Sequence, residues 1–305
     1  GSYLIDGFSS AFSVRAMSVL AALLAITAVG QTLVILIGGI DLSIPFLIGF
    51  GNVVAAKLHG DGYPFELVVV VVLLLAGLIG AFSGGLSSSL KIHPLIVTLG
   101  VGTIVQGSVL LWTSGFPSGS APRYVNNFVS IGATLGPYNI LGIEVGPLPF
   151  PALIPFAFIL AVLIVWILNR TVYGRQLYAL GANPEAARLA LVNPTRMWAI
   201  TYALSAMFAA GAGILLLGFT GSAYAFVGNP YLFETISAVV IGGTSLLGGR
   251  GSYLGTFIGA FVLVELKTLL LGQGLTQALI QATLGVVILI LVSIYGREEH
   301  IRNQI

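Results

Sequence analysis

A succession of long apolar runs separated by short polar connections limits this chain to one class of fold. We count about nine runs that can cross, or nearly cross, the roughly 30 Å of bilayer hydrocarbon at 1.5 Å per residue. They lie at 17–37, 42–56, 66–86, 94–113, 151–168, 197–217, 233–247, 253–271 and 275–295. An open strand in lipid would leave backbone groups unpaired, so each run is predicted to be a helix. The sequence therefore predicts an all-α polytopic membrane protein with a single transmembrane domain over residues 1–305.

Composition agrees with this fold and excludes several classes of function. Only 7% of the residues are charged and 57% are hydrophobic, whereas soluble domains have roughly 25% charged residues. The net charge of +2 comes with no polybasic arm, so nothing favours nucleic-acid binding. The chain has no cysteine, which excludes disulfides and thiolate metal sites. It has no GxxxxGK[ST], HExxH or GxSxG motif, so we predict no catalytic residue, no metal and no cofactor.

One loop carries four of the twelve basic residues and sets the orientation. Segment 169–196 holds four arginines and one acid: Arg170, Arg175, Arg188, Arg196 and Glu185. Arginine-rich loops are retained in the cytoplasm, so we expect this loop inside and the Pro- and Gly-rich stretch 114–150 outside. Three further spans bring Arg297 and Arg302 to the same face, which predicts a cytoplasmic C-terminus. By this count the first span starts outside, so we expect one further helix before it in the native protein.

Two of the runs are shorter than ordinary spans. Runs 42–56 and 233–247 would each reach only about 22 Å, and each borders a glycine-rich break. Short, glycine-interrupted segments at matching places in two halves are the best sequence indication of a transport pathway. We therefore predict a gating or helix-breaking role for Gly38, Gly39, Asp41, Ser43, Gly242, Gly243, Gly248 and Gly249.

The order of the runs predicts an inverted repeat. A first set of four spans covers 17–113 and a second set covers 197–295, with the linking helix 151–168 and the loop 169–196 between them. One intervening helix gives the two sets opposite topologies, as an inverted repeat requires. The strings Val34 to Gly39 and Ala238 to Gly243 are weakly alike, which fits such a repeat.

Three sequence blocks, in order, give the chain a family resemblance. They are GGIDLS at 38–43, LGANPEAARL at 180–189, and the glycine run that ends in GSYLGTFIGA at 251–260. Together they resemble the permease subunits of bacterial ABC importers of the ribose and branched-chain class, and the resemblance covers almost the whole chain. It implies ten helices, of which the first is missing here, in the bacterial inner membrane. It also implies a second permease copy or a sister permease, two ABC ATPase subunits on the cytoplasmic face, and a periplasmic sugar-binding protein.

The inner loop has the features of a coupling helix. Asn183 is predicted to cap a short helix over 184–191, with Pro184 in its first position and Glu185 complementing the helix dipole. Small alanines allow close packing in a partner's groove, and arginines can fork to its carboxylates or carbonyls. On the residues alone, a capped basic surface helix is the plainer explanation. The resemblance implies an ATPase-coupling role for Asn183, Pro184, Glu185, Ala186, Ala187, Arg188, Asn193 and Arg196. Relatives commonly carry Ser-Gly-Ile where this chain has Ala190-Leu191-Val192.

Isolated polar residues in or near the spans have several open roles. Asp41 is predicted to cap or gate the helix break near the inner face rather than bind sugar. Glu234 is expected to complement its helix N-terminus or lie at the outer entrance, and Lys267 to extend toward the outer interface. A weakly polar translocation path could be lined by Gln31, Asn52, Thr98, Gln106, Thr244 and Ser245, although helix packing is a competing role.

The sequence thus predicts the membrane-spanning subunit of an ATP-driven ABC importer for a monosaccharide, with ATP hydrolysed by a separate subunit. The alternatives are an ion-gradient-driven secondary transporter and an ABC permease for branched-chain amino acids or nucleosides. A secondary carrier should pair buried acids in its core, whereas an ATPase-driven permease should have a helical inner loop.

Overall fold

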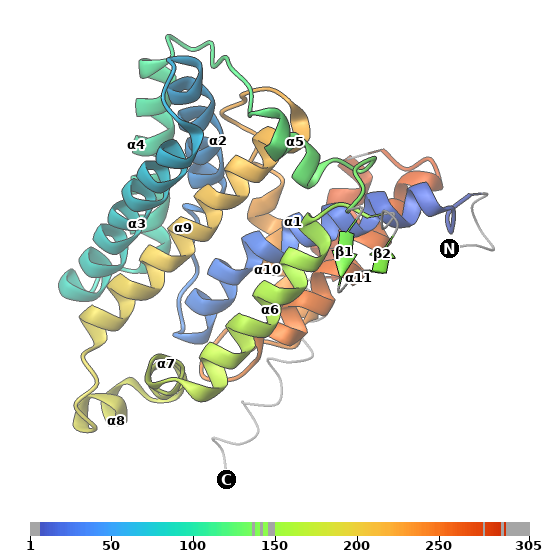
Figure 1. Ribbon diagram of the computed structural model, residues 1–305. Coiled ribbons are helices and arrows are strands. Elements are labelled where there is room, and N and C mark those ends of the chain that lie inside the picture. Colours follow the sequence, from blue (N-terminus) through green and yellow to red (C-terminus); the bar gives the residue numbers. More distant parts are fainter. Residues whose placement is uncertain are drawn as a thin grey trace.

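The chain folds into a bundle of apolar helices (Figure 1). The computed structural model describes residues 7–135, 138–140, 143–145, 150–276, 278–287 and 290. Within them, six helices are long and apolar enough to cross a membrane: α1 (Ala11–Leu36), α3 (Phe65–Leu90), α4 (Pro94–Trp112), α6 (Leu153–Arg170), α9 (Pro194–Thr220) and α11 (Tyr253–Gly272). Three shorter apolar helices are α2 (Ile44–Gly60), α10 (Tyr231–Ile241) and Ala278–Val287. Each predicted run therefore contains one helix, and the all-α membrane fold is confirmed.

The connections contain elements that the apolar pattern did not predict. Stretch 114–150 holds the short helix α5 (Arg123–Val129) and two strands, β1 (Tyr138–Ile140) and β2 (Ile143–Val145). The strands pair antiparallel, with Tyr138 opposite Val145. Loop 169–196 holds two helices, α7 (Val172–Ala182) and α8 (Pro184–Leu189), so the predicted helix 184–191 is two residues too long and α7 was missed.

The two ends of the bundle differ in charge. We call the end that carries α7 and α8 the basic end and the end that carries α5 the opposite end (Figure 1). The basic end holds Lys91, Arg170, Arg175, Arg188, Arg196 and Arg250. Arg297 and Arg302, which the orientation argument also used, lie outside the described residues.

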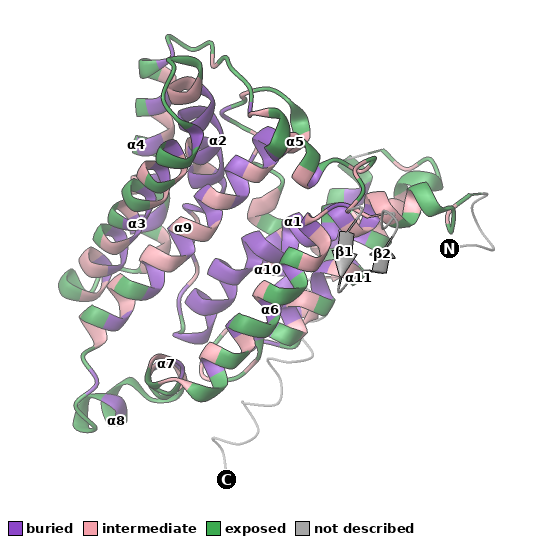
Figure 2. Ribbon diagram, in the orientation of Figure 1, coloured by how far each residue is buried: buried purple, intermediate pink, exposed green. Residues whose placement is uncertain are grey.

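Two helices form the centre of the bundle. In the most apolar 18-residue stretch of each helix, 94% of the residues of α1 and 61% of those of α9 are buried, against 28% in each of α4, α6 and α11 (Figure 2). The outer helices expose large apolar side chains such as Leu78, Ile104 and Ile159, as helices that face lipid do. The centre of the bundle is therefore α1 and α9, with the other helices around them.

The two central helices pack reciprocally. Helix α1, the first of its set of four, packs against α10 and α11 of the second set. Helix α9, the first of the second set, packs against α2 and α3 of the first set, and α1 also contacts α9. Each set thus lends its first helix to the other, which is the arrangement expected if the two sets are equivalent.

The short spans are short because glycines end the helices. Helix α2 has 17 residues and α10 only 11. The prediction that the second short span reaches residue 247 is wrong, because α10 ends at Ile241 and Gly243 takes a φ of +79°. The Thr244 N–H then bonds the Val239 carbonyl at 3.2 Å, a Schellman-type termination.

Helix α1 ends in the same way as α10. Gly38 has a φ of +84°, and the Gly39 N–H bonds the Val34 carbonyl at 2.9 Å. The similarity between strings 34–39 and 238–243 therefore reflects a shared helix terminator. Because α1 and α10 hold different places in the order of the two sets, the strings do not occupy equivalent positions.

Candidate functional site

Three segments that are far apart in the sequence meet at the basic end. The Gly249 N–H donates to the Leu36 carbonyl at 2.9 Å, which joins the loop after α10 to the end of α1. A Cβ on Gly181, in the last turn of α7, would overlap the Leu36 carbonyl oxygen and lie 2.6 Å from the Gly249 nitrogen. The three sequence blocks that carried the family resemblance thus converge on one junction, which we call the glycine junction (residues 36–38, 181–182 and 248–249).

Close backbone contact explains why the glycine junction is built from glycine. Gly248 and Gly249 take φ values of +87° and +70°, which side chains other than glycine rarely adopt. A Cβ on Gly248 would lie 2.8 Å from the Gly38 nitrogen, and one on Gly249 would lie 2.6 Å from the Ala182 Cα. Neither neighbour is a flexible side-chain tip, so displacement of α7 must move the end of α1 and the loop after α10 with it.

Gly242 makes a second close contact, just outside the junction. A Cβ on Gly242 would overlap the backbone of Gly255 at the start of α11. Gly242 thus lies at the end of α10 and also allows α11 to pass directly beside it.

Two tyrosines of α7 fasten it to the membrane helices. The Tyr178 hydroxyl donates to the Gly251 carbonyl at 2.8 Å, and the Tyr173 hydroxyl lies 3.1 Å from the Thr201 hydroxyl of α9. Burial raises the pKa of Tyr173 to about 12 and also raises the pKa of Tyr178, so both phenols stay protonated at neutral pH. Helix α7 is therefore bound to the loop after α10 and to α9 by neutral hydrogen bonds.

Helix α8 begins with the predicted cap. The Asn183 Oδ1 accepts from the Glu185 and Ala186 N–H groups at 3.1 and 3.0 Å, with Pro184 in the first turn. In the same way the Asn193 Oδ1 accepts from the Arg196 N–H at 3.1 Å and begins α9. The predicted cap at Asn183 is confirmed, whereas the cap at Asn193 was not predicted; each satisfies donors that a helix N-terminus leaves unpaired.

Helix α8 has one attached face and one free face. Ala187 and Val192 are buried in the cluster that includes Leu36 and Leu180, whereas Leu189 and Leu191 are 81% and 93% exposed. Arg188 and Glu185 are also exposed, and form a loose ion pair at 3.7 Å. Helix α8 and the turn after it expose two leucines beside two charges at the basic end. Such a surface is suited to a protein partner.

Leu191 sits in a strained turn. Its φ is +63°, and the Val192 N–H bonds the Ala187 carbonyl at 3.0 Å to close the turn. This is the position at which relatives carry the glycine of Ser-Gly-Ile, and glycine adopts such a φ without the cost of about 1–2 kcal/mol that other residues incur. The departure from the family pattern therefore places an exposed leucine where the backbone favours glycine.

Asp41 connects the first helix break to α9. Its Oδ1 accepts from the Ser43 N–H at 2.8 Å and from the Ser43 hydroxyl at 2.5 Å, and its Oδ2 accepts from the Ser205 hydroxyl at 2.7 Å. Asp41 is 1% exposed. The carboxylate thus caps the turn before α2, as predicted, while the Ser43 side chain makes no cap bond to that helix.

The region around Asp41 is tightly packed but incompletely paired. A Cβ on Gly39 would lie 2.5 Å from the Tyr202 hydroxyl, and the Tyr202 ring stacks on Trp198 at 5.6 Å. Within the described residues, the buried hydroxyls of Tyr202 and Thr244 have no hydrogen-bond partner. Neither Tyr202 nor Ser205 was singled out from the sequence, because nothing in their spacing places them at the break.

The residues suggested for a translocation path have separate local roles. Thr98 accepts from the Leu42 N–H at 3.1 Å, and Asn52 bonds the Gly213 carbonyl at 3.2 Å and the Tyr224 N–H at 2.8 Å. Gln106 reaches the Ala225 carbonyl at 3.5 Å, and the Ser245 N–H bonds the Arg250 carbonyl at 3.0 Å. Gln31, in the C-terminal part of α1, is fully buried and its amide has no partner within the described residues. These six residues lie on α1, α2, α4 and the loop after α10, and a common role in a path stays a prediction.

The sequence missed an ion pair at the opposite end. Lys267 of α11 pairs with Glu234 of α10, and their side chains are only 20% and 12% exposed. The ammonium of Lys267 is held by Glu234 between two helices, and the expectation that Lys267 extends toward the outer interface stays a prediction. The pair lines a cavity of 360 Å³ together with polar residues of three elements.

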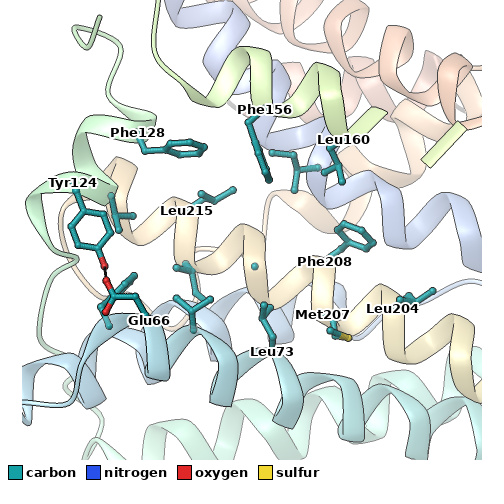
Figure 3. Close-up of a pocket in the computed structure, with 16 residues that line it drawn as sticks. Glu66, Leu73, Tyr124, Phe128, Phe156, Leu160, Leu204, Met207, Phe208 and Leu215 are labelled. Carbon is teal, nitrogen blue, oxygen red and sulfur yellow. Dashed lines mark hydrogen bonds between the residues drawn. The ribbon is translucent and has the colours of Figure 1, made fainter. Parts of the chain in front are cut away.

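A larger cavity of 660 Å³ lies between α3, α5, α6 and α9 and is almost wholly apolar (Figure 3). Its polar feature is at one end, where the Tyr124 hydroxyl donates to Glu66 at 2.8 Å. Desolvation and this hydrogen bond raise the pKa of Tyr124 to about 12. Phe128, Phe156 and Phe208 line the rest, so this cavity offers little to a polar solute.

Comparisons with known proteins agree with the arrangement described above. The family model described as "Branched-chain amino acid transport system / permease component" matches residues 13–293. The chain is similar to the ribose import permease protein of Haemophilus influenzae, with 36% identity over 240 residues, 78% of this chain and 71% of that protein. It is also similar to the fructose import permease protein of Rhizobium meliloti, with 35% identity over 288 residues, 94% of this chain and 78% of that protein. An autoinducer 2 import system permease protein of Escherichia coli K12 is 31% identical over 280 residues, 92% of this chain and 82% of that protein. No solved structure matches the chain.

Proposed function

Because this chain belongs to the family of permease components described for branched-chain amino acid transport systems, we propose that it is the membrane-spanning subunit of an ATP-driven ABC importer for a monosaccharide. It is a multi-pass membrane protein and a transport subunit. The names of its relatives, which refer to import of ribose, fructose and autoinducer 2, favour a sugar over an amino acid. ATP is hydrolysed by separate ABC ATPase subunits, and a periplasmic binding protein delivers the sugar.

The exposed face of α8 is the observation that carries this proposal. Leu189, Leu191 and Arg188 are exposed there, whereas Ala187 on the other face is buried against the membrane helices. The ATPase docks on this face, with the leucines in an apolar groove and Arg188 on a carboxylate or carbonyl of the partner. The docking residues are those predicted from the sequence without Ala187, which is buried in this chain's own core, and with Leu189 and Leu191 added.

The glycine junction transmits the ATPase motion. Helix α8 follows α7 directly, and α7 touches the end of α1 and the loop after α10 through Gly181 and the backbone of Gly249. A shift of α8 therefore displaces the end of α1, which leads into the break at 37–43, and the loop that forms the break at 242–252. Small shifts of this kind change access in transporters because packed helices have discrete arrangements.

The orientation follows from the arginines. The basic end faces the cytoplasm of the bacterial cell, the C-terminus is cytoplasmic, and the opposite end faces the periplasmic binding protein. The gating glycines then lie on the cytoplasmic side, and the cavity of Lys267 and Glu234 lies on the outer side.

The helix order and packing support an inverted repeat. We assign 17–113 and 197–295 as the repeats, with 151–168 as the linking helix and 169–196 as the cytoplasmic coupling loop. The reciprocal packing of α1 and α9 supports this division. A second copy of the chain, or a sister permease, completes the transport path.

Sugar uptake into membrane vesicles tests the proposal directly. Vesicles that contain this chain with its ATPase subunit and binding protein should accumulate sugar only when ATP is supplied inside the compartment that holds the ATPase. Omission of the ATPase subunit should abolish accumulation. ATP-independent accumulation would contradict the importer assignment.

A charge reversal on α8 tests the docking face. Glu185→Arg should weaken assembly with the ATPase subunit and uncouple transport at normal expression, because it reverses the charge next to Arg188. The matched control is Asp61→Arg, which reverses an exposed acid at the opposite end. Normal ATPase assembly of the Glu185→Arg permease would remove Glu185 from the docking surface.

A secondary transporter remains the second candidate because two acids lie among the membrane helices. Asp41 is buried and Glu234 pairs with Lys267 inside the bundle, and intramembrane acids often serve ion-driven carriers. A protonophore separates the two candidates. Uptake that persists after collapse of the proton gradient, with ATP held constant, supports the ABC importer, whereas uptake that stops supports the carrier.

A further inference from the structure

A cavity at the opposite end collects polar side chains from three elements. It lies between α10, α11 and the helix Ala278–Val287 and has a volume of 360 Å³. Its polar lining residues are Asn229, Glu234, Ser237, Lys267 and Gln281. This volume falls in the range of small-molecule pockets, and convergent polar groups in such a pocket are typical of a binding site.

The charged members of the cavity have spare hydrogen-bonding capacity. Lys267 and Glu234 bind each other, so the pair as a whole is neutral. An ammonium has three donors and a carboxylate has about four acceptor positions, so one mutual contact leaves most of them unused. Charged groups also make stronger hydrogen bonds to a neutral partner than amides or hydroxyls do.

The neutral members add groups that both donate and accept. Asn229 and Gln281 are exposed, and neither side-chain amide is hydrogen-bonded within the described part of the chain. Ser237 donates to the Phe233 carbonyl at 2.5 Å, which leaves the oxygen of its hydroxyl free to accept. The Phe233 ring is 68% exposed and gives the cavity one apolar surface.

We propose that this cavity is a contact site for a neutral, polyhydroxylated molecule of monosaccharide size on its way through the permease. A sugar hydroxyl donates and accepts, so it can accept from Lys267 and donate to Glu234 while the ion pair stays intact. The apolar face of the sugar ring lies against Phe233. The assignment rests on the proposed importer function for its direction of transport, and it adds the chemistry and the residues of the site.

The ion pair also argues against an amino acid in the same cavity. A zwitterion would have to take Lys267 with its carboxylate and Glu234 with its ammonium, and so separate two largely buried charges. Separating a buried pair is costly unless both charges are fully satisfied again. A polyol needs no such separation.

Binding at this site is weak by construction. A few hydrogen bonds of modest net strength, offset by the entropy of association, give dissociation constants of roughly millimolar. A weak site suits a transport path, because a tightly held solute would not leave.

Cysteine labelling tests the site without interference from the rest of the protein, since the chain has no cysteine of its own. The single substitutions Asn229→Cys and Gln281→Cys place a thiol at two sides of the cavity, and each leaves the ion pair in place. The full-length permease in membranes is treated with 2-aminoethyl methanethiosulfonate, alone and with D-ribose or D-fructose at tens of millimolar. We expect either sugar to slow labelling of both thiols at least threefold, and leucine at the same concentration to have no effect.

Glu265→Cys is the matched control. Glu265 lies on the same helix as Lys267, two residues earlier and therefore on another face, and it is exposed. Its labelling rate should not respond to sugar. Equal protection of Glu265→Cys, protection by leucine instead of sugar, or no protection of either cavity thiol would each overturn the proposal.

The experiment needs no ATP and no ATPase subunit, so its result is independent of the importer assignment. Sugar protection without ATP-driven uptake would keep the site and remove the importer function. ATP-driven sugar uptake without protection would keep the function and place the sugar elsewhere.

Discussion

The basic end and the opposite end of the bundle are built from different materials. The glycine junction joins α1, α7 and the loop after α10 by backbone contacts, with the Gly249 N–H on the Leu36 carbonyl. The cavity at the opposite end is lined by charged and amide side chains, among them Lys267 and Glu234. Backbone packed on backbone transmits displacement with little slack, whereas long polar side chains adapt to a solute. The difference fits the proposed function, in which the ATPase acts at one end and the sugar is bound at the other.

The sharpest way to break this comparison is to add a side chain at the glycine junction. Gly181→Val would overlap the Leu36 carbonyl and the Gly249 nitrogen, so we expect a loss of more than about 4 kcal/mol of stability. The apparent unfolding temperature of the purified permease measures this. Gly100→Ala is the control, because its Cβ would meet nothing within 4 Å. A Gly181→Val protein as stable as the Gly100→Ala protein would show that the three segments are not in contact.

The ion pair at the opposite end should be less costly to alter, and reversibly so. Lys267→Met leaves Glu234 unpaired and should cost about 3 kcal/mol. The double substitution Glu234→Gln with Lys267→Met removes both charges and should recover most of that loss. The same thermal unfolding measurement applies to Lys267→Met, to Glu234→Gln alone and to the double variant. If the losses simply add, the two side chains do not interact.

Asp41 provides a test at the boundary between the helix break and α9. Ser205→Ala removes the donor to the Asp41 Oδ2 and should cost about 2 kcal/mol, since a buried carboxylate oxygen loses its partner. Ser108→Ala is the control, because the Ser108 hydroxyl bonds only the Ile104 carbonyl of its own helix. Equal unfolding temperatures for the two variants would mean that the contact between Asp41 and α9 contributes nothing.

The smallest expected effect separates stability from coupling. Leu191→Gly relieves a φ of +63° and should stabilise the turn by about 1 kcal/mol. It also removes a 93% exposed leucine from the docking face, so stimulation of the ATPase subunit should fall. Unfolding temperature and ATP hydrolysis are measured on the same preparation. A rise in both would show that Leu191 serves neither docking nor coupling.

Much of the fold was predictable because lipid imposes simple rules. Each apolar run became a helix, and the cap at Asn183 followed from a residue type that pairs with free N–H groups. The gating glycines were identified for the same reason, since two of them end α1 and α10 at positive φ. These features depend on neighbours close in the sequence, which a single chain reveals.

The remaining features depend on partners far apart in the sequence. Helix α7 was missed because its tyrosines and glycines are typical of a loop in sequence. Its contacts with the loop after α10, through Tyr178 and Gly181, cannot be inferred from neighbours in the sequence. Lys267 was assigned to the interface because nothing in the sequence shows Glu234, 33 residues away, beside it. The contact of Asp41 with Ser205 spans 164 residues and was equally hidden.

The reciprocal packing of α1 has a consequence for biosynthesis. Helix α1 is almost completely covered in the finished protein, yet α9, α10 and α11, which supply much of that cover, are translated long after it. Its buried Gln31 and the neighbouring Thr32 must therefore stay in lipid, or beside an insertion factor, until α11 is made and the Thr256 hydroxyl pairs with Thr32 at 3.0 Å. If translation stopped between the two sets of helices, the released chain would lack the helices that cover α1. Helix α1 would then be exposed to membrane proteases.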